Sequence, residues 1–104
     1  MIPFVLAVSM MATAQIPAAP QRQQFANCLR SFMNAKLEER MAVAAFDTAV
    51  STACAEQETA YRTAYLAAAT RAGDTRARAE QDASLEVQDL RANFRDLFHN
   101  SQPD

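Results

Sequence analysis

Apolar residues recur every three or four positions along most of the chain after residue 20, which is the spacing of one face of an α-helix. The first series consists of Phe25, Cys28, Leu29, Phe32 and Met33. It predicts a helix over about 20–37, with Pro20 at the start, where the first turn of a helix tolerates proline.

A second, longer series follows the charged stretch at 36–40. Its members are also three or four residues apart: Phe46, Val50, Cys54, Gln57, Tyr61, Tyr65, Ala68 and Ala72. Because nothing interrupts this spacing, it predicts one long helix over about 44–72. The run Gly73-Asp74-Thr75 then reads as a glycine that ends a helix followed by an N-capping side chain, so a turn is expected at 73–75.

A third series predicts a helix over about 75–99. Its apolar positions alternate steps of four and three, as in a packed helical seam: Ala83, Val87, Leu90, Phe94 and Leu97. The pattern therefore predicts an all-α fold, a three-helix antiparallel arrangement in which the second and third helices form a long, coiled-coil-like hairpin. The tail after residue 99 is expected to fray.

The first fourteen residues differ from the rest because they contain no charged side chain. The apolar run 2–12 has the length of a signal-peptide core and is too short to span a membrane. Ala12 and Ala14 are small residues at the positions that a signal peptidase recognises, so cleavage is expected between Ala14 and Gln15. The sequence thus predicts a signal peptide over 1–14 and one helical domain over 15–104.

Export implies a periplasmic or secreted protein without a stable membrane span after cleavage. The segment departs from the usual signal pattern because no Lys or Arg precedes the apolar run. The alternative is a buried N-terminal helix of a cytoplasmic protein. Pro3 and the break between Pro17 and Pro20 disfavour it.

The two cysteines also favour a periplasmic or secreted protein. They form no CxxC motif and have no set of zinc ligands around them, so a Cys28–Cys54 disulfide is the simplest prediction. The midpoint between them is Met41, in the expected first turn, as an antiparallel hairpin requires. Closing this loop would stabilise the fold by roughly 3.5 kcal/mol on the chain-entropy model. The alternative is a pair of buried free thiols.

The expected turn at Gly73 also sets the register of the second hairpin. Reflection about it places Cys54 level with Phe94 and Val50 level with Leu97, so the large apolar residues gather at one end. The other end is rich in alanine: Ala64, Ala67, Ala68 and Ala72 would face Ala79 and Ala83. Alanine buries little area, so this end is expected to be marginally stable alone and to need a partner.

The net charge and the individual polar residues give few signs of a binding or catalytic function. A net charge of −2 on 104 residues gives no basic surface for nucleic acid. His99 is interpreted as a helix-end residue. The carboxylates of Glu38, Glu39, Glu56 and Glu58 lie among Lys36, Arg40 and Arg62 at helical spacings, which favours a solvated, ion-paired face. Tyr61 and Tyr65 are candidates either for a contact patch or for capping the core.

The sequence contains no Gly-rich phosphate loop, no nucleophile beside a plausible base and no metal-ligand cluster. It therefore predicts a protein that is not an enzyme and has no cofactor or metal. The signal-like start, the Ala- and Arg-rich helical chain and the two spaced cysteines resemble uncharacterised small exported helical proteins of α-proteobacteria. This resemblance implies no function.

The leading hypothesis is an exported interaction protein of the cell envelope, either a homodimer through the Ala-rich hairpin or a module for another envelope protein. Two alternatives remain open. One is a carrier or sensor that holds an apolar ligand near Phe25, Phe32, Phe46 and Phe94. The other is a secreted inhibitor of an envelope enzyme.

Overall fold

The structure, a computed structural model, describes residues 17–102, and these form four α-helices without strands. They are α1 (Ala19–Glu38), α2 (Val43–Val50), α3 (Ala55–Arg71) and α4 (Arg76–Asn100). The predicted all-α fold is confirmed. The predicted signal peptide and the cleavage site at Ala14 and Gln15 lie outside the described residues.

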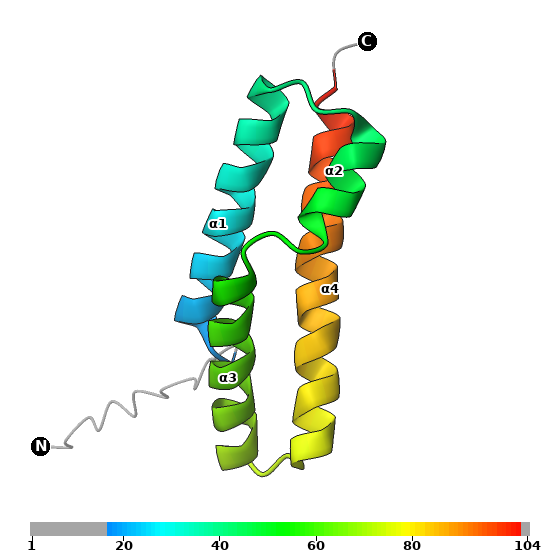
Figure 1. Cartoon of the computed structure of the whole chain (residues 1–104). Helices are drawn as coiled ribbons and strands as arrows, with labels where there is room; N and C mark the ends of the chain where they lie inside the picture. Colours follow the sequence, from blue (N-terminus) through cyan, green and yellow to red (C-terminus); the bar gives the residue numbers. More distant parts are fainter. Residues whose placement is uncertain (1–16, 103–104) are drawn as a thin grey trace, which may run out of the picture.

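The long helix α4 runs the length of the bundle and the other helices pack along it (Figure 1). α1 and α2 cover one end of α4, and α3 begins beside α1 and continues past the start of α1 (Figure 1). The last part of α3 and the first part of α4 therefore form a two-helix hairpin. We call residues 66–82 the hairpin tip.

The single helix expected over 44–72 is wrong, because residues 51–54 separate α2 from α3. Cys54 has a φ of 62° and a ψ of 40°, which is left-handed backbone that ends helical continuity. Periodicity missed this break because the apolar spacing continues through it. The first helix, at Ala19–Glu38, matches the expected range closely.

Two turns follow from their local sequences. After α3, Gly73 adopts a φ of 105° and its N–H bonds the Thr70 carbonyl, while the Asp74 N–H bonds the Ala69 carbonyl. This is the Schellman geometry that glycine favours. The Thr75 hydroxyl then accepts a hydrogen bond from the Arg78 N–H at 3.2 Å. The predicted glycine end and N-capping side chain are both confirmed, and the capping residue is Thr75.

The turn after α1 uses the same geometry with a different residue. Arg40 takes the left-handed position, its N–H bonds the Leu37 carbonyl, and the Met41 N–H bonds the Lys36 carbonyl. Met41 packs against the core, which gives the motif its usual apolar contact. The turn lies where the cysteine midpoint placed it.

One contiguous apolar core lies at the end of α4 away from the tip. All four helices contribute to it: Phe25, Leu29, Met33, Phe46, Val50, Tyr61, Val87, Leu90, Phe94 and Phe98. Leu97, expected in the core, is 40% exposed, and Phe98 takes its place with its ring stacked on Phe46 at 3.8 Å. From Phe94, a step of four residues departs from a full helical turn by about 40° and a step of three by about 60°, so either can continue the seam, and stacking on Phe46 of α2 favours Phe98.

Candidate functional site

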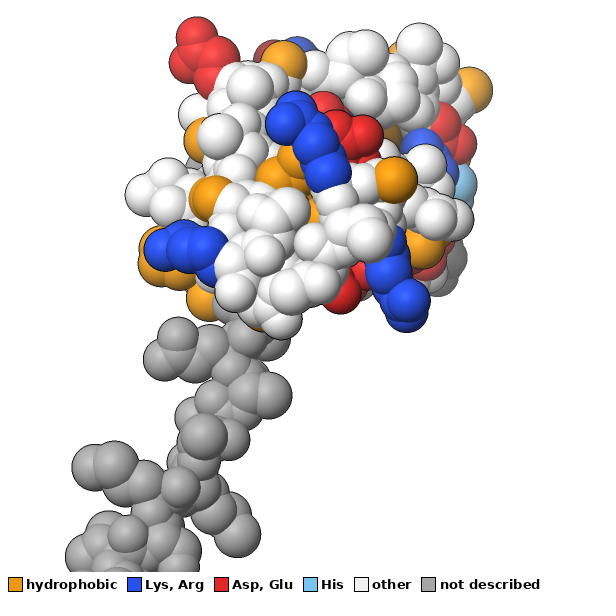
Figure 2. All heavy atoms as spheres, turned by 90° about the horizontal axis from the view of Figure 1, so that it is seen from below, with side chains coloured by type: hydrophobic (Ala, Val, Ile, Leu, Met, Phe, Trp, Pro, Cys, Tyr) orange, Lys and Arg blue, Asp and Glu red, His pale blue; other side chains and the backbone are white. Residues whose placement is uncertain are grey.

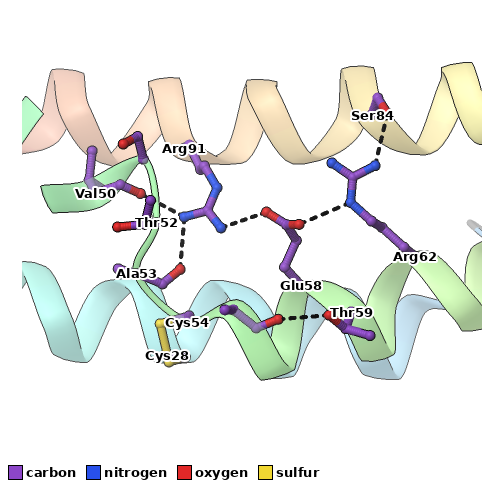
Figure 3. A network of polar contacts seen from close by, with 12 residues as sticks. Cys28, Val50, Thr52, Ala53, Cys54, Glu58, Thr59, Arg62, Ser84 and Arg91 are labelled. Atoms are coloured by element: carbon purple, nitrogen blue, oxygen red, sulfur yellow. Dashed lines mark hydrogen bonds and ion pairs between the residues drawn. A yellow bond between two sulfur atoms is a disulfide. The ribbon is translucent and has the colours of Figure 1, made fainter. Parts of the chain in front are cut away.

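The most highly connected polar side chain among the described residues is Arg91 of α4. It is 7% exposed, and its guanidinium donates to the carbonyls of Val50 at 2.6 Å and Ala53 at 2.8 Å. It also bonds the carboxylate of Glu58 at 2.6 Å (Figure 3). We call this arrangement, residues 50–58 with Arg91 and the Cys28–Cys54 bond, the junction.

The contacts of Arg91 match the needs of two helix ends. The carbonyls at the end of α2 have no helical N–H to accept from, and a cation beside them is favoured by the helix dipole. Glu58 lies in the first turn of α3, where the dipole favours an anion. One ion pair thus places a cation beside the C-terminus of α2 and an anion in the first turn of α3.

Glu58 is shared between two arginines. Its second carboxylate oxygen accepts from Arg62 at 3.0 Å, and Arg62 in turn donates to the Ser84 hydroxyl at 2.8 Å (Figure 3). Partial burial alone would raise the pKa of the Glu58 carboxyl, but the hydrogen bonds and charges of Arg91 and Arg62 outweigh it and lower this pKa below its usual value. The carboxylate is therefore held in its charged form.

The predicted disulfide is confirmed. Cys28 of α1 and Cys54 are bonded, with their Cα atoms 6.1 Å apart, and the bond forms the side of the junction that faces α1 (Figure 3). Cys54 is the residue in left-handed conformation, so the bond ties the break in the helix to α1. The ion-paired interpretation of the acidic residues also holds for Glu39, which bonds Lys36 at 3.0 Å.

The two tyrosines differ in position. Tyr61 is fully buried, stacked near Phe25 at 6.4 Å, and thus fills the core, which is one of the two roles its spacing left open. Tyr65 is half-buried and meets Tyr61 edge-on at 6.0 Å. Burial, followed by the charge of Glu86, raises the pKa of Tyr61. Tyr61 cannot line a contact surface, and Tyr65 offers only its outer edge.

His99 belongs to a pair of contacts between α4 and α2. Its Nε2 lies 2.8 Å from the Asp47 carboxylate, and Arg95 is 3.6 Å from the same oxygen. All three side chains are partly exposed. They hold α2 on α4, and no nucleophile or further base converges on them in the part of the chain that the structure covers.

The hairpin tip is the least buried part of the described bundle. Within residues 66–82 only Ala69 and Ala79 are buried. A shallow depression of about 320 Å³ between α3 and α4 is lined by Thr63, Leu66, Ala67, Thr70 and Arg76. Figure 2, which views the molecule from below, shows charged side chains that are separated rather than gathered into one patch.

Metal and membrane chemistry find no support in residues 17–102. No group of three or more His, Cys, Asp or Glu could hold a metal ion there. Within the same range, no helix combines the length and the apolar character that crossing a bilayer requires.

Comparison with known proteins identifies no relative: no family model, no curated protein and no solved structure matches this chain. Sequence reasoning missed Arg91, although position 91 continues the four-residue spacing of Ala83 and Val87. The signal available in the sequence was an arginine at a position of α4 where the spacing predicts an apolar residue.

Proposed function

We propose that this chain is an exported, non-catalytic protein of the cell envelope that works through protein interaction, and that its partner is a second copy of itself. The observation that carries the proposal is the outward side of α3. Five exposed positions there are small and uncharged: Thr59, Ala60, Thr63, Ala67 and Thr70. We call these five residues the α3 outer face.

The chemistry of this face favours a covered surface over a solvated one. Solvated helix faces in globular proteins usually carry charged side chains. Here the Thr59 and Thr70 hydroxyls donate to the carbonyls of Ala55 at 3.0 Å and Leu66 at 2.7 Å. With their hydroxyls bonded to the helix backbone, these threonines leave mainly methyl groups for a partner. Small side chains also let a second helix approach closely.

The charges at the two ends of the face suit a second copy of α3. Glu56 lies at one end and Arg71 at the other, both exposed, about 22 Å apart along the helix. An antiparallel copy related by a two-fold axis near Thr63 brings each Glu56 opposite Arg71 of the partner subunit. Such an axis makes every favourable contact twice. It also sets the two helix dipoles antiparallel.

Export is supported by the disulfide, because such bonds persist in oxidising compartments. The signal-like composition of residues 1–14 supports it from the sequence. The ligand-carrier alternative receives less support. Phe25 and Phe46 are fully buried, Phe46 stacks on Phe98, and none of the four described depressions is lined by these rings.

Sedimentation equilibrium of the oxidised chain from residue 15 onward tests self-association. We expect a monomer–dimer equilibrium, and Ala67→Glu should abolish the dimer because it puts a long, charged side chain into a contact made of small, uncharged residues. Ala45→Glu, at an exposed position of α2, is the matched control and should dimerise as the original chain does. A protein that stays monomeric at millimolar concentration would contradict the proposal.

A charge exchange tests the antiparallel arrangement. Arg71→Glu should weaken the dimer roughly ten-fold, because two facing pairs become repulsive. Adding Glu56→Arg should restore the original affinity. If the double variant dimerises no better than Arg71→Glu, the partner does not dock in this orientation.

A further inference from the structure

The break between α2 and α3 falls inside a regular apolar spacing. This spacing is that of a helix before residues 51–54, after them and across them. Phe46, Val50, Cys54, Gln57 and Tyr61 would all lie on one face of a continuous helix, because each follows the last by three or four residues. The same sequence therefore supports two backbones for residues 51–54. One is the break in the structure, and the other is a single helix from 43 to 71.

Two ties from different helices hold the break. Arg91 of α4 bonds the carbonyls of Val50 and Ala53, and Cys28 of α1 is bonded to Cys54. Figure 3 shows α4 and α1 on opposite sides of the segment. Within a few residues the chain is thus bonded first to α4 and then to α1. This sideways displacement explains why a left-handed residue stands in the middle of a helical pattern.

The break leaves backbone donors that a continuous helix would use. The N–H groups of Ser51 and Thr52 bond carbonyls three residues back, and the next bond runs from the Glu58 N–H to the Cys54 carbonyl. Residues 53–57 donate no backbone hydrogen bond in the described structure. In a joined helix, these five amides would donate to the carbonyls of residues 49–53.

We propose that the Cys28–Cys54 bond is a redox switch for this segment. With the bond intact, the break persists; after a dithiol reductant has cleaved it, Cys54 leaves the left-handed region and α2 joins α3. Both cysteines are half-buried and Ser51 and Thr52 are exposed, so a reductant can reach the bond and the segment has room to rearrange.

The chemistry is ordinary thiol–disulfide exchange. A thiolate of the reductant attacks one cysteine sulfur, which breaks the Cys28–Cys54 bond, releases the other cysteine as a thiolate and forms a mixed disulfide. The second thiolate of the reductant then attacks the reductant's own sulfur in this mixed disulfide and releases the first cysteine. The disulfide gains two electrons and two protons and becomes two thiols, while the dithiol becomes a disulfide. This switch does not depend on the proposed dimer, because Arg91 and Cys28, which hold the break, both lie outside the α3 outer face.

Two double variants without the disulfide separate the backbone effect from the loss of the bond. Cys28→Ala with Cys54→Ala places a strong helix former at the break, whereas Cys28→Ala with Cys54→Gly places the residue that best tolerates positive φ there. Amide hydrogen exchange of residues 53–57 is measured in both, in the oxidised chain, and in the chain reduced with dithiothreitol.

We expect exchange of these amides to slow by about ten-fold or more in the alanine variant and in the reduced chain, relative to the oxidised chain. The glycine variant should exchange as fast as the oxidised chain. Equal exchange in the two variants, or faster exchange in the alanine variant, would overturn the proposal. The amides of residues 87–94 in α4 report on folding, and loss of their protection in the alanine variant would overturn it as well.

Discussion

The two ends of α4 are covered in different ways. Toward its C-terminus, α4 packs against α1 and α2 through large rings and aliphatic side chains, and the junction adds a disulfide and a buried arginine. Toward its N-terminus it meets only the end of α3, with Ala69 and Ala79 as the buried residues of the tip (Figure 1). The C-terminal end of α4 is therefore buried in the core, whereas its N-terminal end stays largely exposed.

The energetic contrast follows from side-chain size. A buried Phe or Leu contributes about 1.5–3 kcal/mol, and an alanine methyl contributes much less. The core has four phenylalanines that are at most 1% exposed, namely Phe25, Phe46, Phe94 and Phe98. A small protein can therefore keep one end stable while surface outside that core remains free to associate.

The largest effect is expected at the junction. Arg91→Ala should lower the free energy of unfolding by about 3 kcal/mol, because it leaves Glu58 without its closest partner and two carbonyls without a donor. Denaturant unfolding measures this loss. The conservative Arg91→Lys should lose less, because it keeps the ion pair but cannot reach all three acceptors.

Arg78→Ala is the matched control at the tip. Its side chain is exposed, so we expect a change within about 0.5 kcal/mol. Equal losses for Arg78→Ala and Arg91→Ala would show that the junction contributes no more than an ordinary surface residue.

An intermediate effect is expected from pH. The pKa of Glu58 is lowered in the folded state, so its stabilising contribution is complete well above the unfolded value of about 4.3 and is lost as the pH falls through the folded value. The original chain should exceed Glu58→Gln in unfolding free energy at about pH 6, and the gap should close toward about pH 3. Parallel stability curves for the two proteins would contradict this role of the carboxylate.

The smallest effect is expected at the tip. Thr75→Ala removes the side-chain cap of α4 and should cost about 1 kcal/mol. Hydrogen exchange should show the loss in the first turns of α4 and leave the core amides unchanged. A loss of protection that spreads equally into residues 87–94 would indicate that the tip and the core unfold as one unit.

Local sequence signals predicted the parts of the fold that depend on local physics. Glycine and threonine at 73 and 75 fixed the last turn, and the apolar spacing located helical segments on both sides of it. The cysteine spacing predicted both the bond and the position of the first turn. Each of these depends on neighbouring residues or on a simple reflection of the chain.

The junction could not be predicted in the same way. The break at 51–54 depends on contacts from Arg91 and Cys28, which are distant in sequence from the segment they hold. Apolar spacing is blind to such contacts because it continues unchanged through the break. Tyr61 illustrates the same limit, since its spacing fitted both a core and a contact role, and only its packing against Phe25 places it in the core.

Hydrogen exchange of the oxidised chain at two protein concentrations tests the central claim, that the core end of the bundle holds the fold and the α3 outer face binds a second copy. We expect the amides of residues 59–70 to exchange more slowly in concentrated than in dilute solution, while those of residues 87–94 stay equally protected in both. Protection of residues 59–70 that does not change with concentration would contradict the account.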